Sequence, residues 1–370
     1  MSEDPQCRVC GHANRADALF CDRCTSPVGV VALGDLTEED YAHCRSALFH
    51  LLATMGPHSP SETSPLWLRY LSAFWLRPET ALICFAEARA LREIASDRRD
   101  RWLDLGCGDG IHSALAAGWS FDDAFDAFQG LDLAAADIYH HWDPARFGAE
   151  VTERGETIAI GCDIKETAIE RSRALGVFDR LILADATELP IDAGSIDGIF
   201  SNMLRDLGPT LGPALAECCR VLSDDGRLYI SAMTPHYADN LYFAPLAQKS
   251  VSDGLPEEYV RFLLRLDRGR SVFCRQQLSA EKWNELLHEA GLEVVRTVPL
   301  VGAKTIKFWD VGFRPFSVQL IEQAQKWREQ GVLKAVKPPM VTLLDTLLRS
   351  LTVDRGEEVP CMNLLEIAKR

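Results

Sequence analysis

From residue 99 onward, short apolar runs alternate with longer stretches in which apolar residues recur every three or four positions. The short runs are typical of strands buried in a parallel sheet, and the longer stretches are typical of helices that cover it. The predicted strands are 101–105, 157–163, 181–185, 195–203, 226–233, a segment after Gly291, and 361–370. This alternation predicts an α/β fold with a doubly wound, seven-stranded, mostly parallel sheet.

One predicted connection between a strand and a helix is rich in glycine. The apolar run 101–105 leads directly into Gly106, Gly108 and Gly110, and residues 111–117 then have helical spacing. Glycine tolerates positive φ and has no Cβ, so the backbone of such a turn can contact a ligand. The unpaired N–H groups at the start of the following helix would face the same ligand. The turn therefore predicts a binding site at the end of the first strand.

Residues 31–98, which precede the α/β domain, are predicted to form a helical segment. A capped helix is expected from Thr37 onward, and 67–76 and 79–94 predict two more helices. Four aromatic residues recur here at helical spacing: Trp67, Tyr70, Phe74 and Trp75. We expect them to pack against the α/β domain rather than to line a substrate site.

The composition limits the possible partners and compartments. The chain has 370 residues and a net charge of −15. Phosphate binding needs clustered Lys and Arg, so this negative charge argues against a nucleic-acid partner. The N-terminus lacks the basic and apolar regions of a signal peptide, and no apolar run is long enough to span a bilayer. We therefore expect a cytoplasmic protein without a membrane span.

Four of the twelve cysteines form a doubled CxxC pattern: Cys7, Cys10, Cys21 and Cys24. Two such turns facing each other make the tetrahedral sulfur site that Zn²⁺ prefers. Residues 1–30 are therefore predicted to be a zinc ribbon, in which the structural metal supplies most of the folding energy. The alternative is a set of reduced thiols or a redox pair. A ribbon could contact RNA, bind a protein partner or brace its neighbour.

Five segments resemble, in order, the motifs of class I S-adenosylmethionine-dependent methyltransferases of type 11. They are 103–110, 161–164, 184–190, 196–202 and 220–228. The resemblance extends more loosely from residue 99 to 370, and it implies a Rossmann-like methyltransferase domain with S-adenosylmethionine as its cofactor. A nicotinamide cofactor is the weaker alternative, because the glycine turn lacks the GxGxxG spacing.

The resemblance also implies which residues contact the cofactor. The methionine part of the cofactor would be held by Asp104, Gly106, Cys107 and Gly108, and the ribose would be held by Asp163. The adenine would contact Ile164, Asp185 and Ala186. The sulfonium would lie near Ser201 and Asn202. Each acid could instead cap a helix or a turn. Asp132 is a rival for the ribose, but the continuous succession of strand, acid, helix, strand and acid from 157 to 185 favours Asp163.

Methyl transfer requires alignment, exclusion of water and, for some acceptors, a base. His236 is our first candidate, with Tyr237 beside it, because residues 234–237 follow the fifth strand where many such enzymes face the acceptor. His140 and His141 lie in an insertion, residues 119–156, that could be a substrate lid or an ordinary surface loop.

The predicted function is methyl transfer from S-adenosylmethionine to a small or medium organic acceptor, on oxygen, nitrogen or carbon, in a biosynthetic pathway. No Asn-Pro-Pro-Tyr element follows the fourth strand, and by resemblance this counts against base or glutamine methylation. The alternatives are a zinc-ribbon methyltransferase acting on RNA or protein, and a non-catalytic docking partner with this fold. The helical additions 234–290 and 303–358 would cover the acceptor or form a homodimer face.

Overall fold

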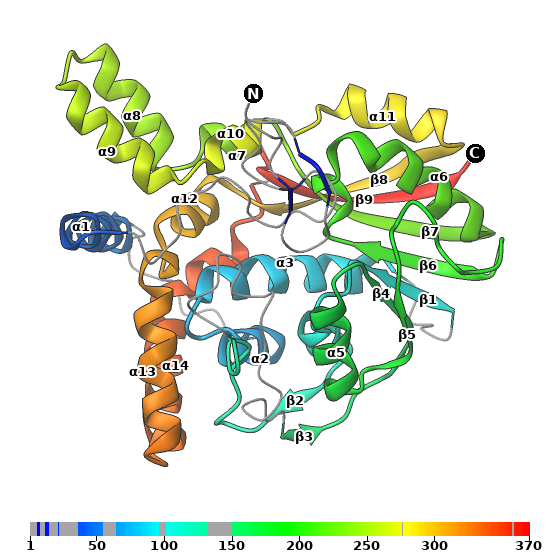
Figure 1. Cartoon of the computed structure of the whole chain (residues 1–370), viewed down its shortest axis with the longest axis horizontal. Helices are drawn as coiled ribbons and strands as arrows, with labels where there is room; N and C mark the ends of the chain where they lie inside the picture. Colours follow the sequence, from blue (N-terminus) through cyan, green and yellow to red (C-terminus); the bar gives the residue numbers. More distant parts are fainter. Residues whose placement is uncertain are drawn as a thin grey trace.

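The computed structural model describes residues 6–7, 12–14, 21, 36–54, 64–95, 101–131, 150–275, 277–356 and 359–370. Its centre is a seven-stranded sheet in the order β5-β4-β1-β6-β7-β9-β8 (Figure 1). The strands are β1 (Trp102–Leu105), β4 (Ile158–Asp163), β5 (Phe178–Leu183), β6 (Ile196–Ser201), β7 (Leu222–Met233), β8 (Leu292–Val301) and β9 (Met362–Lys369). All seven predicted strands are present, so the predicted sheet is confirmed.

The strand pairing is that of a doubly wound fold. Strands β5, β4, β1, β6 and β7 pair with one another in parallel, whereas β9 runs antiparallel between β7 and β8. The chain builds outward from β1 in both directions, first through β4 and β5 and then through β6 and β7. A ligand crevice is expected where such a sheet changes direction, beyond the carboxyl ends of β1 and β6.

Helices cover both faces of this sheet and extend beyond one end of it (Figure 1). The helices are α1 (Glu38–Thr54), α2 (Pro65–Ala73), α3 (Pro78–Ile94), α4 (Ile111–Ala116), α5 (Glu166–Leu175), α6 (Leu211–Val221), α7 (His236–Asp239), α8 (Phe243–Ser252), α9 (Glu257–Asp267), α10 (Arg270–Arg275), α11 (Ala280–Glu289), α12 (Ala303–Val311), α13 (Ser317–Glu329) and α14 (Leu333–Leu348). Short 3-10 helices include η3 (Leu204–Asp206) and η5 (Arg314–Phe316). In the described part of the chain, every helix is too short or too polar to cross a membrane.

Each face of the sheet has its own hydrophobic core. Side chains of α6 and α11, such as Leu215 and Trp283, pack with Leu103 of β1 on one face. Side chains of α2, α3, α4 and α5 pack with Trp102 on the other face. Successive residues of a strand point to opposite faces, so β1 contributes alternately to the two cores.

The predicted insertion contains a small second sheet that the sequence pattern did not indicate. Strands β2 (Ser120–Phe121) and β3 (Val151–Glu153) pair antiparallel, and residues 132–149 between them lie outside the described part. Trp119 fixes the base of this sheet, since its buried indole Nε1 donates to the Glu156 carbonyl at 2.8 Å. Strands of two and three residues are too short for an apolar alternation to be recognised.

The four aromatic residues around α2 pack in the core, as expected. Trp67, Tyr70, Phe74 and Trp75 are all buried. The Trp67 indole also donates from Nε1 to Oδ1 of Asp345 at 2.8 Å, which joins α2 to α14. The segment before β1 is therefore part of the main core.

A buried polar network lies between α3, α4 and the sheet. The hydroxyl of Tyr70 donates to the His112 carbonyl at 2.9 Å and also lies 3.0 Å from His112 Nδ1. His112 Nε2 lies 3.8 Å from Oε2 of Glu87, whose other oxygen accepts from the Ser231 hydroxyl at 2.6 Å. Burial lowers the pKa of His112, while the nearby Glu87 opposes that shift. The network links α2, α3, α4 and β7 through groups that are shielded from water.

Asp104 of β1 belongs to the same face as this network. Its side chain is buried, and its carboxylate accepts a hydrogen bond from the Ser113 hydroxyl. Burial raises the pKa of Asp104 to about 7, against the opposing effect of the Ser113 hydrogen bond, and the charges of Asp163 and Glu87 add to the rise. Asp104 therefore keeps its proton in the folded protein at a pH where an unfolded chain would lose it.

Replacement Asp104→Asn should change how stability depends on pH. Because the folded pKa lies above the unfolded value of 3.8, this carboxyl lowers the free energy of unfolding as pH rises from about 4 to about 7. The Asp104→Asn variant has no titrating group at this position, so its free energy of unfolding should not fall in this way. The difference in free energy of unfolding, variant minus wild type, should therefore rise by on the order of 2 kcal/mol between pH 5 and pH 8. Urea unfolding at both pH values measures the difference.

The matched control is Asp179→Asn, because Asp179 is an exposed residue of β5. Its stability relative to the wild type should be the same at both pH values. If the difference in stability between Asp104→Asn and the wild type is also the same at both pH values, the raised pKa of Asp104 is contradicted.

Candidate functional site

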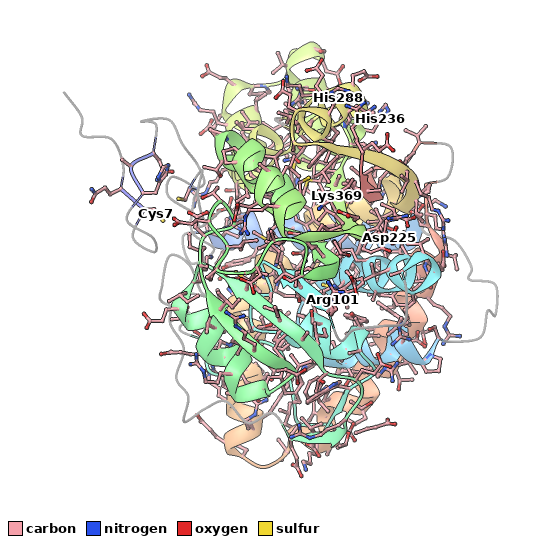
Figure 2. The ribbon with its side chains drawn as sticks, turned by 90° about the vertical axis from the view of Figure 1, so that its right-hand side faces the viewer. Cys7, Arg101, Asp225, His236, His288 and Lys369 are labelled. Carbon is pink, nitrogen blue, oxygen red and sulfur yellow. The ribbon has the colours of Figure 1, made fainter. Side chains whose placement is uncertain are left out.

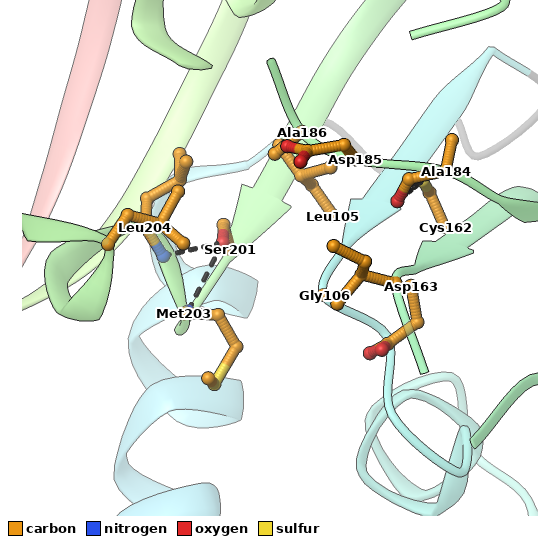
Figure 3. Close-up of a pocket in the computed structure, with 12 residues that line it drawn as sticks. Leu105, Gly106, Cys162, Asp163, Ala184, Asp185, Ala186, Ser201, Met203 and Leu204 are labelled. Carbon is orange, nitrogen blue, oxygen red and sulfur yellow. Dashed lines mark hydrogen bonds between the residues drawn. The ribbon is translucent and has the colours of Figure 1, made fainter. Parts of the chain in front are cut away.

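A pocket opens at the carboxyl ends of β1, β4, β5 and β6 (Figure 3). It is lined by Leu105, Gly106, Cys162, Asp163, Ile164, Ala184, Asp185, Ala186, Ser201, Met203, Leu204 and Leu207. Six of the predicted cofactor residues are among them: Gly106, Asp163, Ile164, Asp185, Ala186 and Ser201. The fold thus brings together residues that are up to 95 positions apart in the sequence, from Gly106 to Ser201.

The glycine turn is held against the end of β4 by backbone hydrogen bonds. The N–H groups of Gly106 and Cys107 both donate to the Cys162 carbonyl, at 2.8 and 3.0 Å. Gly106, Gly108 and Gly110 have φ values of +81°, +56° and +76°, which L-residues with a side chain rarely adopt. The turn therefore depends on glycine for its conformation.

Gly106 and Gly108 also differ in what surrounds them. A Cβ on Gly106 would lie 2.8 Å from Cγ of Met203, so this position has no room for a side chain. A Cβ on Gly108 would have no atom within 4 Å. Gly106 is thus required for close packing against Met203, whereas the space beside Gly108 is open.

Asp163 connects the second strand to the glycine turn. Its Oδ2 accepts from the Gly108 N–H at 2.9 Å, and its Oδ1 accepts from the Lys165 N–H at 2.8 Å. Burial raises the pKa of Asp163, while the hydrogen bonds from Lys165 and Gly108 oppose the rise. These bonds fix the carboxylate at the wall of the pocket, where its oxygens can accept from ligand hydroxyl groups.

Asp185 is fixed by the turn that follows β5. Its Oδ1 accepts from both the N–H and the hydroxyl of Thr187, at 3.0 and 2.9 Å. Such a turn holds an aspartate in one orientation. The small residues Ala184 and Ala186 on either side line the same pocket and leave space for a flat ligand group.

Ser201 has a structural role at the end of β6. Its buried hydroxyl accepts from the N–H groups of Met203 and Leu204, both at 3.2 Å, as Figure 3 shows. It therefore positions Met203 beside Gly106. Sequence reasoning missed Met203, although its place just beyond a strand end is the signal that could have identified it.

Four predicted cofactor residues do not line this pocket: Asp104, Cys107, Gly108 and Asn202. Asp104 faces the opposite side of the sheet, because β1 directs Leu105 into the pocket and residues alternate along a strand. Cys107 is buried, and burial raises the pKa of its thiol. Gly108 touches the site through its hydrogen bond to Asp163.

The predicted acceptor-side residues also lie outside the pocket. His236 is exposed at the start of α7, and Figure 2 shows it near the edge of the molecule. Tyr237 is buried, with its ring edge-on to Trp309 at a centroid distance of 5.6 Å. His140, His141 and the rival acid Asp132 fall outside the described residues. The fold therefore places no candidate base of the sequence prediction in the pocket, as far as the described residues go.

Two of the four predicted zinc ligands are described. Cys7 and Cys21 are both buried, at 2% and 1% exposure. The Cys7 N–H donates to the His12 carbonyl at 2.8 Å, and Gln6 and Ala13 form an antiparallel bridge around it. Residues 6–7 thus pair antiparallel with residues 12–13. Cys10 and Cys24 lie outside the described residues, and Figure 2 shows Cys7 at the edge of the molecule.

Comparison with known proteins agrees with this geometry. Residues 144–230 match the family model of the methyltransferase domain. A malonyl-[acyl-carrier protein] O-methyltransferase of Methylococcus capsulatus is 47% identical over 51 residues, a match that covers 14% of this chain and 18% of that relative.

Solved structures with a similar fold include an S-adenosylmethionine-dependent methyltransferase of Thermotoga maritima, described as a possible histamine N-methyltransferase. It is 17% identical with a TM-score of 0.36, over 63% of this chain and 84% of that chain. The [4+2]-cyclase SpnF is 14% identical with a TM-score of 0.40, over 92% and 98% of the two chains. The strand order of the sheet and the match over residues 144–230 together support a class I S-adenosylmethionine-dependent methyltransferase domain in this chain.

Proposed function

We propose that this protein transfers a methyl group from S-adenosylmethionine to a small or medium organic acceptor in a biosynthetic pathway. The observation that carries the proposal is the convergence of Gly106, Asp163 and Asp185 on one pocket at the carboxyl ends of the central strands. The malonyl-[acyl-carrier protein] O-methyltransferase among the relatives supports an acceptor of biosynthetic type. The methylated atom stays open between oxygen, nitrogen and carbon.

The residues of the pocket fit the parts of this cofactor. The Asp163 carboxylate, held by the Gly108 N–H, would accept from the ribose hydroxyls, and Asp185, held by the Thr187 N–H, would accept from the adenine amino group. Ile164 and Ala186 supply apolar contacts for a flat ring. When bound, S-adenosylmethionine supplies an activated methyl group on a sulfonium.

The chain's own contribution is alignment and exclusion of water. The apolar side chains of Met203, Leu204 and Leu207 line the pocket beside the glycine turn and would keep water from that part of it. His236 is exposed and Tyr237 is buried in the core, so the proposal gives neither residue a role as base.

We also propose that the N-terminal segment binds one structural Zn²⁺ through Cys7, Cys10, Cys21 and Cys24. The burial of Cys7 and Cys21 and the hydrogen bond from the Cys7 N–H to the His12 carbonyl fit such a site. Thiolates hold Zn²⁺ as four tetrahedral ligands, and the metal would stabilise a segment too short to bury its own core.

Replacement Asp163→Asn should weaken binding of S-adenosylhomocysteine. The amide offers one acceptor oxygen in place of two charged ones, so it cannot hold the glycine turn, the Lys165 N–H and the ribose together. A hydrogen bond to a charged group contributes about 1.5 to 3 kcal/mol, so we expect an affinity loss of about 10- to 100-fold by calorimetry.

Asp179→Asn is again the matched control, because it makes the same chemical change at an exposed position of the neighbouring strand β5. Its affinity should equal that of the wild type. Unchanged affinity in Asp163→Asn, or no binding to the wild type, would reject the proposed function.

Replacement Gly106→Ala should destabilise the protein and weaken cofactor binding through one identifiable contact. The new Cβ would clash with Met203, and the positive φ adds strain, so we expect a stability loss of about 2 kcal/mol. Met203→Ala in the same chain should recover part of this loss, because it removes the clashing atoms. Chemical unfolding of the two single variants and the double variant gives the coupling free energy between Gly106 and Met203. If the stability losses of the two single variants simply add in the double variant, the contact is unimportant.

Replacement Cys21→Ser should lower the bound zinc, measured by elemental analysis of the purified protein, from about one ion per chain to well below one. Affinity for S-adenosylhomocysteine should stay as in the wild type, since no described residue of the N-terminal segment lines the cofactor pocket. Cys219→Ser leaves the CxxC pattern intact and should keep its zinc. Full zinc content in Cys21→Ser would rule out this metal site.

A further inference from the structure

Four arginine side chains from three separate segments lie close to one another, and two of them, Arg270 and Arg314, lie beside Trp309. Arg77 lies between α2 and α3, Arg268 and Arg270 lie where α9 gives way to α10, and Arg314 begins η5. The guanidinium carbons of Arg314 and Arg270 lie 4.5 and 5.9 Å from the centroid of the Trp309 ring. Burial, followed by the charges of Arg77 and Arg270, lowers the pKa of Arg314 to about 9, so this group remains charged at neutral pH.

Arg314 and Arg270 have donors that no protein group uses. Among the described residues, the side chain of Arg314 makes no hydrogen bond and no ion pair, and its Nε is buried. Arg270 is 95% buried; its Nη2 lies 2.6 Å from Oδ1 of Asp310 and donates to the Leu266 carbonyl at 3.0 Å. Its Nε and Nη1 are buried without an acceptor in the described structure.

The carboxylates around this cluster are already engaged by other groups. Glu79 lies 3.5 Å from Arg77 and accepts from the Phe313 N–H at 3.3 Å. The second oxygen of Asp310 accepts from the N–H groups of Tyr242 and Phe243, at 2.8 and 3.1 Å.

Asp267 accepts from the N–H and the hydroxyl of Ser271, and burial raises its pKa. Its capacity to neutralise the cluster is reduced accordingly. Among the described residues, these three acids leave Nε of Arg314 and Nε and Nη1 of Arg270 without an acceptor.

The cluster lies beyond the carboxyl ends of the strands, next to the cofactor pocket. Tyr237, at the end of β7, packs edge-on against Trp309. Asp206, three residues after Met203 of the pocket, is close enough to Cys274 of α10 to raise the pKa of that thiol. Figure 1 shows α7, α10 and α12 together at this end of the sheet.

We propose that Arg314, Arg270 and Trp309 form a binding site for an oxyanion, a carboxylate or phosphate group carried by the methyl acceptor. Guanidinium N–H groups that are buried without an acceptor are costly to keep, as at Nε of Arg314 and at Nε and Nη1 of Arg270. The planar donors of a guanidinium match both kinds of oxyanion in a two-point contact. The link to the acceptor rests on the proposed methyltransferase function, while anion binding itself does not.

Thermal unfolding with and without inorganic phosphate or malonate tests the site. In the wild type, at least one of the two anions should raise the melting temperature, because a ligand that binds only the folded state stabilises it. Arg314→Met should lose this response and should melt higher than the wild type without anion, because it removes a buried charge that lacks a partner. Calorimetry should show at least a tenfold loss of affinity.

Two further variants keep the test decisive. Arg173→Met removes an exposed arginine of α5 and should respond to the anion like the wild type. Arg314→Lys keeps the charge without the two-point geometry, and it should bind the anion at least threefold more weakly even if Arg314→Met does not fold. A response to malonate alone identifies a carboxylate, and a response to phosphate alone identifies a phosphorylated acceptor.

The absence of any anion response in the wild type, or an equal response in the wild type and the Arg314 variants, would overturn the inference. Calorimetry with S-adenosylhomocysteine on the same samples separates this outcome from failure of the proposed function. Cofactor binding without an anion response rejects the anion site alone. An anion response without cofactor binding supports the anion site and rejects the methyltransferase proposal.

Discussion

The hydrogen bonds between the end of β4 and the glycine turn determine the geometry of the site. The Cys162 carbonyl accepts from two successive N–H groups of the turn, and the next residue, Asp163, accepts from a third. One strand end thus fixes the backbone path of the turn and directs its own carboxylate into the same pocket. Any displacement of β4 relative to β1 would therefore change the turn and the carboxylate together, which explains why both are built on adjacent central strands.

Much of this site could be predicted from the sequence because regular periodicities specify it. Apolar runs located every strand of the seven-stranded sheet. Because parallel strands place their carboxyl ends along one edge, Gly106, Asp163 and Asp185 were expected to meet there. The same alternation explains the position of Asp104, since a residue adjacent to the pocket-lining Leu105 faces the other core. Side chains outside regular strands, such as His236 and Met203, depend on the path of a turn, which no periodicity describes.

The arginine cluster could not have been predicted in this way. Its members come from three connections between helices, separated by more than 200 residues from Arg77 to Arg314, and each is an ordinary charged residue in its local sequence. The net charge of −15 argued against a positively charged cluster. A sum over the chain, however, says nothing about how charges are distributed in space. Only tertiary packing brings these four arginines together and places two of them beside the Trp309 ring.

The antiparallel strand β9 has a consequence for how this protein is made. It lies between β7 and β8, pairing Tyr229 with Glu366 on one side and Val298 with Leu364 on the other. During synthesis, β8 emerges from the ribosome well before β9, and in the finished sheet it has no other strand partner. Its ladder must stay open until residues 362–369 arrive, so this half of the sheet assembles late and exposes an unpaired strand that chaperones can recognise.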